Sequence, residues 1–287
     1  MSDSTPSPRW QDLTSRALSC LPNRTVAVMV VGAIEQHGAH LPLSTDLDIG
    51  EGLLEEAMSQ LPEGFPMVIL PPMAVGASDE HLSFAGTLSL PPELAIATLE
   101  AHGDAVARAG MDRLVLINSH GGNKAVMDLA ALRLRRRHGM LVVKVHYTRM
   151  PPPEPLTAGP LPGGSLPSEE WRHGLHGGAL ETAMMRHLAP HKVRTDKLDH
   201  PRSQGETMEE EGLLLGPEGE AAFAWLAEDL HPRGVVGNAP LGTPELGAHL
   251  VAHYGRRIAR ILQETQGRRI DDLLDRAHAP HDPAAES

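Results

Sequence analysis

Short apolar runs alternate with longer helical patterns through the first half of the chain, and this alternation constrains the fold more than any other feature. The run VAVMVVGAI at 26–34 is typical of a buried strand, and further strands are expected at 67–70, 114–117 and 141–145. Helices are expected between them at 48–61, 92–109 and 124–138. Strands that alternate with helices form right-handed βαβ units. The sequence therefore predicts an α/β fold, a three-layer α/β/α sandwich around a mostly parallel sheet.

A segment rich in Pro and Gly at 150–170 interrupts this pattern, and we interpret it as either a functional loop or a linker. Helical patterns resume at 178–187, 218–229 and 244–263. No internal repeat is present. The simplest organisation is one domain over residues 10–275, with disordered tails at 1–9 and 278–287.

Charge and composition exclude several classes of protein. The chain has 25 Lys and Arg against 37 Asp and Glu, a net charge of −12, which argues against a nucleic-acid binder because phosphate neutralisation needs clustered cations. The single cysteine, Cys20, excludes an internal disulfide framework and a cysteine zinc cluster. No apolar run approaches the roughly 20 residues of a membrane helix, and no hydrophobic signal segment is evident. We therefore expect a soluble, cytoplasmic protein without membrane partners.

The first group of polar residues follows the strand expected at 26–34. Glu35 and His37 project together, because residues two apart in an extended chain point the same way. The turn at 38–44 then brings Asp46 back to the same edge, where the carboxyl ends of parallel strands bind ligands. Carboxylate and imidazole ligands together suit zinc, manganese or iron, whereas magnesium favours oxygen alone. The alternative is an ordinary loop in which Asp46 caps a helix.

A second polar segment lies between the strand expected at 114–117 and the helix after it. It contains His120, Gly121, Gly122 and Asn123. A glycine pair lets the backbone approach a ligand closely, and a helix N-terminus offers free N–H groups. The segment is therefore a second part of a metal site, a phosphate-binding turn without catalysis, or a tight corner.

Two further segments carry ionisable side chains. Glu181 enters a helix after His176, either as a further metal ligand with His176 as a proton carrier, or as an acid that favours the helix dipole. Glu80 and His81 lie in a polar loop, where they contact substrate and water at the metal site or are simply solvated.

Taken together, these segments resemble the creatininase (creatinine amidohydrolase) family. The similarity begins at 35–46 (EQHGAHLPLSTD) and recurs in order at 80–81 (EH), 86–90 (GTLSL), 118–123 (NSHGGN) and 176–182 (HGGALET). A weaker match lies at 234–247, so that the resemblance spans about 26–247. It implies a three-layer α/β metal-dependent amidohydrolase, usually a homohexamer, with two divalent metal ions per chain.

The resemblance also implies roles for individual residues. Glu35 and His120 bind one ion, His37 binds the other, and Asp46 bridges both, while His176 aligns with the catalytic histidine of the family. In creatininase the second ion gains a Glu two residues after the equivalent of His120. Gly122 stands at that position here, and Glu181 is the expected substitute.

The substrate is less constrained by the resemblance. Creatininase holds its small cationic substrate with aromatic residues, whereas here Trp171 lies slightly out of register and Gly121 replaces an aromatic residue. A Glu-His pair at 80–81 is typical of relatives such as a formamidopyrimidine deformylase, a keto-inositol hydrolase and the mycofactocin precursor peptidase.

We therefore expect hydrolysis of a C–N bond in a small amide, cyclic amides included, with those three relatives as alternatives. The expected catalytic residues are His176 and Glu80, and the expected substrate contacts are His81, Gly121, Gly122, Asn123 and Trp171. A less favoured alternative is a metal-binding assembly subunit that has lost catalysis.

Overall fold

The computed structural model describes residues 9–153 and 166–272 of the chain. Its central sheet has four strands in the order β2-β1-β3-β4, and every neighbouring pair is parallel. The strands are β1 (Val26–Val31), β2 (Met67–Ile69), β3 (Arg113–Asn118) and β4 (Leu141–His146). The predicted α/β fold with a mostly parallel sheet is thus confirmed.

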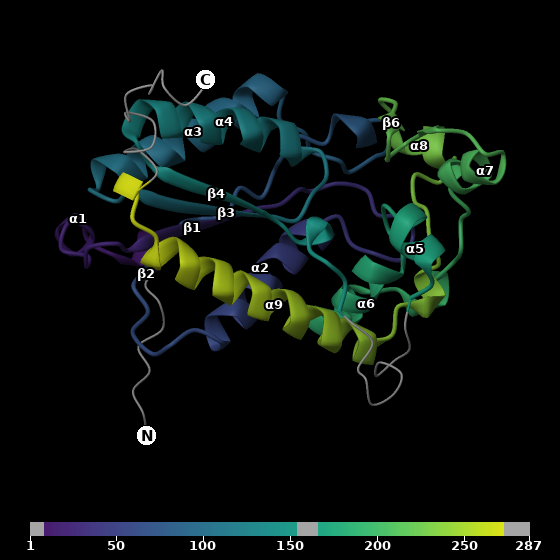
Figure 1. Cartoon of the computed structure of the whole chain (residues 1–287). Helices are drawn as coiled ribbons and strands as arrows, with labels where there is room; N and C mark the ends of the chain where they lie inside the picture. Colours follow the sequence, from purple (N-terminus) through teal and green to yellow (C-terminus); the bar gives the residue numbers. More distant parts are fainter. Residues whose placement is uncertain (1–8, 154–165, 273–287) are drawn as a thin grey trace, which may run out of the picture.

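Helices cover both faces of the sheet (Figure 1). One face carries α2 (Thr45–Ser59), α6 (Ala179–Leu188) and α9 (Pro244–Gly267), and the other carries α3 (Pro92–Arg108) and α4 (Asn123–His138). Strand β1 serves both layers, since Val28 and Val30 join the core under α9 while Ala27 and Met29 join the core under α3. Burial on both faces explains why this strand is an uninterrupted apolar run.

The connections place a crevice at the carboxyl ends of β1 and β3. From β1 the chain passes through α2 to β2 on one side, and from β3 it passes through α4 to β4 on the other side. Such a reversal in strand order separates the loops that follow the two central strands, and ligands of open α/β sheets bind there. The segments that begin at Glu35 and at Ser119 leave the sheet at this point.

The region after α6 differs most from the predicted pattern. Instead of a helix over 218–229, the structure has the short strand pair β5 (Leu215–Gly216) and β6 (Ala221–Ala222), followed by the short helix α8 (Ala227–Leu230). Gly219 between the strands has a φ of 111°, a conformation that a helix cannot contain. The remaining helices are α1 (Ser15–Leu18), α5 (Ser168–His173) and α7 (Gln204–Glu210).

Short 3-10 turns join several of these elements. Two of them matter for the site, at Asp79–His81 and at Tyr147–Arg149. The others lie at Trp10–Asp12, Pro190–Lys192, Thr195–Lys197 and Ala239–Leu241.

Most of the segment rich in Pro and Gly, and most of both expected tails, lie outside the described residues. Arg9, which the sequence assigned to a tail, forms a parallel bridge with Ile69. Among the helices at 9–153 and 166–272, none combines the length and apolar character needed to cross a membrane.

Candidate metal centre

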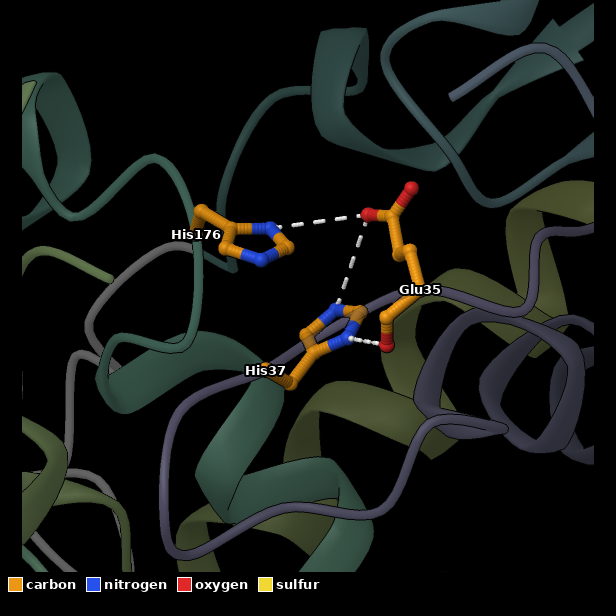
Figure 2. Close-up of side chains that lie close together, drawn as sticks. All are labelled: Glu35, His37 and His176. Atoms are coloured by element: carbon orange, nitrogen blue, oxygen red, sulfur yellow. Dashed lines mark hydrogen bonds and ion pairs between the residues drawn. The ribbon is translucent and has the colours of Figure 1, made fainter. Parts of the chain in front are cut away.

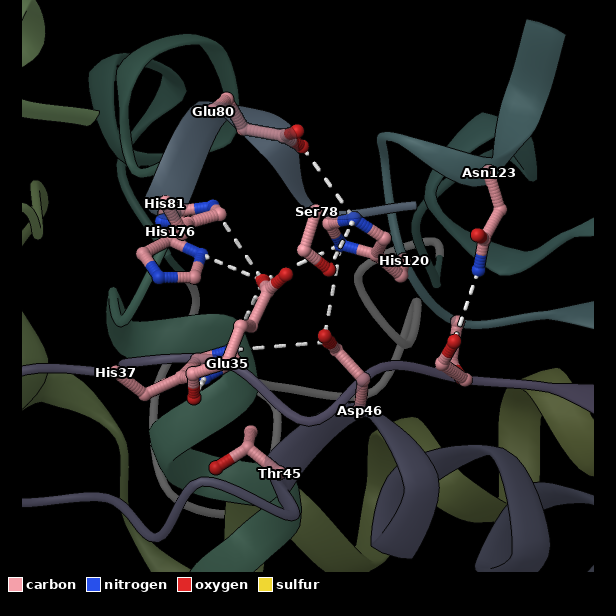
Figure 3. Close-up of polar contacts among 12 residues, drawn as sticks. Glu35, His37, Thr45, Asp46, Ser78, Glu80, His81, His120, Asn123 and His176 are labelled. Carbon is pink, nitrogen blue, oxygen red and sulfur yellow. Dashed lines mark hydrogen bonds and ion pairs between the residues drawn. The ribbon is translucent and has the colours of Figure 1, made fainter. Parts of the chain in front are cut away.

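Five side chains from four separate loops and helix starts converge at the crevice. Figure 3 shows four of them, Glu35, His37, Asp46 and His120. Glu35 and His37 follow β1, Asp46 lies in the first turn of α2, His120 follows β3, and Glu181 lies in the first turn of α6. The structure thus brings together all five residues that the sequence assigned to metal binding. The carboxylate of Asp46 faces the rings of His37 and His120, which sets aside the alternative of a simple helix cap.

Glu35 lies at the middle of the cluster. Its Oε1 is 3.2 Å from His120 Nδ1, 3.4 Å from His81 Nε2, 3.7 Å from His176 Nδ1 and 4.0 Å from His37 Nε2. Figure 2 shows the neighbouring rings of His37 and His176, both facing this oxygen. One carboxylate oxygen therefore faces four imidazoles without a hydrogen bond of acceptable geometry to any of them.

Asp46 joins the two halves of the cluster. Its Oδ1 lies 3.7 Å from His37 Nε2, and its Oδ2 lies 3.5 Å from His120 Nδ1. On the far side, Glu181 Oε2 lies 3.8 Å from His37 Nε2. The ligand atoms consequently form one group of Glu35, Asp46 and His120 and a second group of His37, Asp46 and Glu181.

The donor atoms fit a bound cation. Both carboxylate oxygens of Glu35, Nε2 of His37 and Oδ2 of Asp46 are buried and have no hydrogen-bond partner among the described residues. Buried carboxylates are costly unless a proton, an ion pair or a metal compensates them. A third possible ligand group, Glu35, His37 and His176, uses residues of the other two and is therefore an alternative to them.

The charges of the cluster compensate one another through the imidazoles. Burial lowers the pKa of His37, but the carboxylates of Asp46, Glu181 and Glu35 outweigh it and raise that pKa to about 9. Burial raises the pKa of Asp46 to about 7, with help from the charge of Glu35. Without a cation the imidazoles hold protons among the carboxylates, and a metal ion that binds there replaces them.

The two ligand histidines are oriented by contacts on their outer sides. His37 Nδ1 donates to the backbone oxygen of Glu35 over 3.1 Å, which turns Nε2 towards the cluster. His120 Nε2 lies 2.9 Å from the oxygen of Ala77 and 3.3 Å from Glu80 Oε1, which turns Nδ1 towards the cluster. Contacts of this kind fix the tautomer of a metal-binding imidazole. The structure thus places Glu80 against His120, where it orients a ligand.

His176 is held as a neutral imidazole. Its ring lies between His37 and His81, with ring centroids 4.1 and 4.2 Å away, and its Nε2 donates to the backbone oxygen of Gln36 over 2.7 Å. Burial and the charges of the two neighbouring histidines hold the pKa of His176 well below its usual value. The proton therefore resides on Nε2, and Nδ1 is the atom that faces Glu35.

The Gln36 side chain organises this layer, a role that the sequence did not assign. Its Nε2 donates to the oxygen of Gly234 over 2.6 Å and to Nδ1 of His81 over 3.0 Å. The position between two ligand residues in the sequence was the only available signal, because its partners lie 45 and 198 residues away.

Gly122 has no room for a side chain. A Cβ atom there would lie 2.3 Å from the oxygen of Ala77 and 2.6 Å from Glu80 Oε1. The carboxylate of Glu80 and the loop at Ala77 thus fill the space into which a Glu at this position would have to pass. Glu181 supplies its carboxylate from the opposite side, beside His37.

A cavity of about 730 Å³ opens onto the cluster. Among the expected substrate residues, His81, Gly121 and Trp171 line it. Asn123 has a different role: its buried side chain accepts from the N–H of Ala77 and donates to the oxygen of Gly32. Asn123 therefore links the backbone at Ala77 to the backbone at Gly32 and is not among the residues that line the cavity. Gly122 likewise packs against the Ala77 loop and does not line the cavity.

Further lining residues were not expected from the sequence. They include Tyr147, which directly follows β4, and an apolar group that follows α7 in the chain, Leu213, Leu214, Leu215 and Trp225. The carboxyl end of β4 was a usable signal for Tyr147, since it follows the same rule that identified Glu35 and His120. No local sequence pattern identifies these four apolar residues as part of the cavity.

Comparisons with known proteins identify the family of this chain. The family model for creatininase, described as creatinine amidohydrolase, matches residues 9–262. A mycofactocin precursor peptide peptidase of Mycobacterium ulcerans (strain Agy99) is 31% identical over 253 residues, 86% of this chain and 85% of that protein. A creatinine amidohydrolase of Pseudomonas putida is 29% identical over 205 residues, 67% of this chain and 74% of that protein.

A solved structure described as "Creatininase Mn" has the same fold, with a TM-score of 0.70 and 24% identity over 91% of this chain and all of that chain. The match of the family model covers most of the sequence and includes every residue of the cluster. The chain therefore belongs to the creatininase family of amidohydrolases.

Proposed function

We propose that this chain is a metal-dependent amidohydrolase that cleaves an amide bond within a peptide. The cavity is the observation that carries this proposal. It extends from the cluster past Trp171 to Leu213, Leu214 and Leu215, and its volume of about 730 Å³ exceeds what one small cyclic amide fills. The similarity to a mycofactocin precursor peptide peptidase over most of both chains supports a peptide substrate. Of the alternatives considered from the sequence, the peptidase is thus preferred over the small cyclic amide.

The proposal includes two ions per chain, which the two ligand groups support. Glu35, Asp46 and His120 would hold one divalent ion, and His37, Asp46 and Glu181 would hold a second. When bound, such ions polarise a carbonyl oxygen and lower the pKa of water. The mixed nitrogen and oxygen donors suit zinc, manganese or iron.

His176 moves the proton in this proposal. Its Nδ1 faces the cluster and carries no proton, so it accepts one from the attacking water. The same atom then donates that proton to the amide nitrogen as the C–N bond breaks, which yields a carboxylic acid and an amine. The hydrogen bond from Nε2 to the oxygen of Gln36 keeps Nδ1 in place through both transfers.

The test is an amidase assay with Mn²⁺- or Zn²⁺-loaded protein. A synthetic mycofactocin precursor peptide, creatinine and a formamide are offered in parallel, and products are identified by mass spectrometry. We expect cleavage of the peptide, and we expect His176→Ala to slow it by about 10²–10⁴-fold. His187→Ala, a change to an exposed histidine on α6, is the matched control and retains the wild-type rate. An intact peptide under conditions where creatinine or the formamide is hydrolysed overturns the proposal.

Hydrolysis of creatinine is the second candidate. The 29% identity to a creatinine amidohydrolase over 205 residues favours it. The parallel assay separates the two, because a creatinine hydrolase turns over creatinine and leaves the peptide intact.

A further inference from the structure

Tyr147 is a buried residue of the cavity for which the mechanism above has no role. It is the first residue after β4, at the same edge of the sheet as Glu35 and His120. Its side chain is 1% exposed and lines the cavity together with Asp46 and Glu181.

The hydroxyl of Tyr147 serves no contact within the fold. Its Oη has no hydrogen-bond partner among the described residues, although buried phenols normally find one. The ring, by contrast, is firmly held: it packs edge-on against Tyr254, with centroids 5.5 Å apart and an interplanar angle of 62°. Packing thus fixes the ring and leaves a donor and acceptor unused beside the metal centre.

The surroundings of Tyr147 determine the protonation state of its hydroxyl. Burial, followed by the carboxylates of Glu181 and Asp46, raises the pKa of Tyr147 well above its usual value. The hydroxyl therefore keeps its proton and is a neutral donor. Glu181 Oε2 accepts a hydrogen bond from the N–H of Gly177 over 2.7 Å.

Tyr147 and His176 approach the cluster from different sides. Tyr147 lines the cavity together with Glu181 and Asp46, whereas the ring of His176 lies beside Glu35 and His81. The proposed substrate amide has two polar ends, a nitrogen that His176 serves and an oxygen that needs a donor. A buried neutral donor is well suited to an oxygen that gains negative charge.

We propose that Tyr147 is a catalytic residue whose Oη–H donates a hydrogen bond to the oxygen of the scissile amide. The inference rests on the proposed function, because it requires an amide in this cavity. No bond to Tyr147 forms or breaks, and its proton remains on Oη throughout. Its contribution is a hydrogen bond that strengthens as the amide oxygen becomes an oxyanion.

The experiment compares Tyr147→Phe with Tyr254→Phe, which makes the same chemical change on the neighbouring ring. For Tyr147→Phe we expect kcat to fall by about 10²–10³-fold with KM within about threefold of wild type. Metal content is expected to match that of wild type. Because the variant removes an unpaired buried hydroxyl, its melting temperature is expected to be equal to that of wild type or roughly 2–4 °C higher. Tyr254→Phe is expected to keep kcat within about threefold.

The outcomes separate this inference from the proposed function. Wild-type protein that cleaves the peptide, with Tyr147→Phe equally active, overturns the role of Tyr147 alone. A loss of kcat accompanied by lost metal or a lower melting temperature assigns Tyr147 to the structure of the site and also overturns the inference. Wild-type protein that hydrolyses no amide overturns the proposed function and this inference with it.

Discussion

Asp46 is the residue on which both halves of the metal centre depend. Its two oxygens face His37 and His120 separately, so the loss of its charge affects both ligand groups at once. Asp48 lies one half-turn further along the same helix, yet it binds Lys192 over 2.8 Å at the surface. The two aspartates therefore form a natural pair for substitution.

We predict that Asp46→Asn lowers metal affinity by at least about 10–100-fold and removes both ions on dialysis, because a neutral amide is a poor bridging ligand. Metal content measured by inductively coupled plasma mass spectrometry checks this. Asp48→Asn serves as the control and keeps its metal. Full metal content in Asp46→Asn would contradict the ligand assignment.

At the scale of elements, the turn between β3 and α4 supports the centre through tight packing. Gly121 and Gly122 are adjacent, but a Cβ at Gly121 would have no atom within 4 Å, whereas one at Gly122 would clash with the loop at Ala77 and with Glu80. Neither glycine has a positive φ, so backbone strain does not separate them.

We therefore predict that Gly122→Ala destabilises the protein by about 1–3 kcal/mol, while Gly121→Ala changes the free energy of unfolding by less than about 0.5 kcal/mol. Urea denaturation of the two variants measures the difference. Equal free energies of unfolding for the two variants would show that the Ala77 loop moves aside without destabilising the protein.

The edge between β3 and β4 carries an acid-sensitive contact. Asn118 Nδ2 donates to His146 Nδ1 over 3.0 Å, a bond that requires this nitrogen to be unprotonated. Burial, with the positive charges of Arg149 and Lys124, lowers the pKa of His146 to about 4. The unfolded chain binds a proton near the ordinary pKa of 6.5, so stability is lost as the pH falls from 6.5 through about 4.

We predict that wild type loses about 1–2 kcal/mol more stability than His146→Asn between about pH 7 and pH 4, a value that allows for solvent screening of this partly exposed ring. Denaturant titrations of both proteins at the two pH values check this. Parallel pH profiles for the two proteins would refute the role of His146.

At the scale of the whole molecule, the candidate metal ligands join several layers of the fold. Its ligands come from the ends of β1 and β3 and from the starts of α2 and α6, and the carboxylates of Glu35 and Asp46 are buried without compensating cationic side chains of Lys or Arg in the described chain. Bound cations are therefore expected to stabilise the fold as well as the site.

We predict that removal of metal with EDTA lowers the melting temperature by roughly 5–10 °C, which corresponds to a ligand present at about 100 times its Kd. Differential scanning calorimetry before and after chelation measures this shift. Asp46→Asn is expected to show little change on chelation, and a wild type that is insensitive to EDTA would argue against a structural contribution of the ions.

The homohexamer implied by the family resemblance stays a prediction, which a measurement of molar mass by light scattering checks.

Much of the fold was predictable because its signals are local. The apolar run of β1 and the glycine that ends α4 in a left-handed turn at Gly139 are visible within a few residues. The prediction of a helix at 218–229 was wrong, because the glycines on either side of Pro217 favour a turn. A count of helix-forming residues does not detect the positive φ of Gly219. The five expected ligands came together because parallel strands end at one edge of the sheet.

The sequence by itself determined the parallel α/β architecture and which side chains are candidate metal ligands, since both depend on residue type and short-range spacing. Only the tertiary structure decided which atoms each side chain presents. Ala77 and Glu80 contact His120 across 40 or more residues of chain, and packing against Tyr254 holds the ring of Tyr147, whose hydroxyl is unpaired among the described residues. Those arrangements arise from contacts between segments that are remote in sequence, because close packing of several elements, and not local preference, sets the position of a buried polar atom.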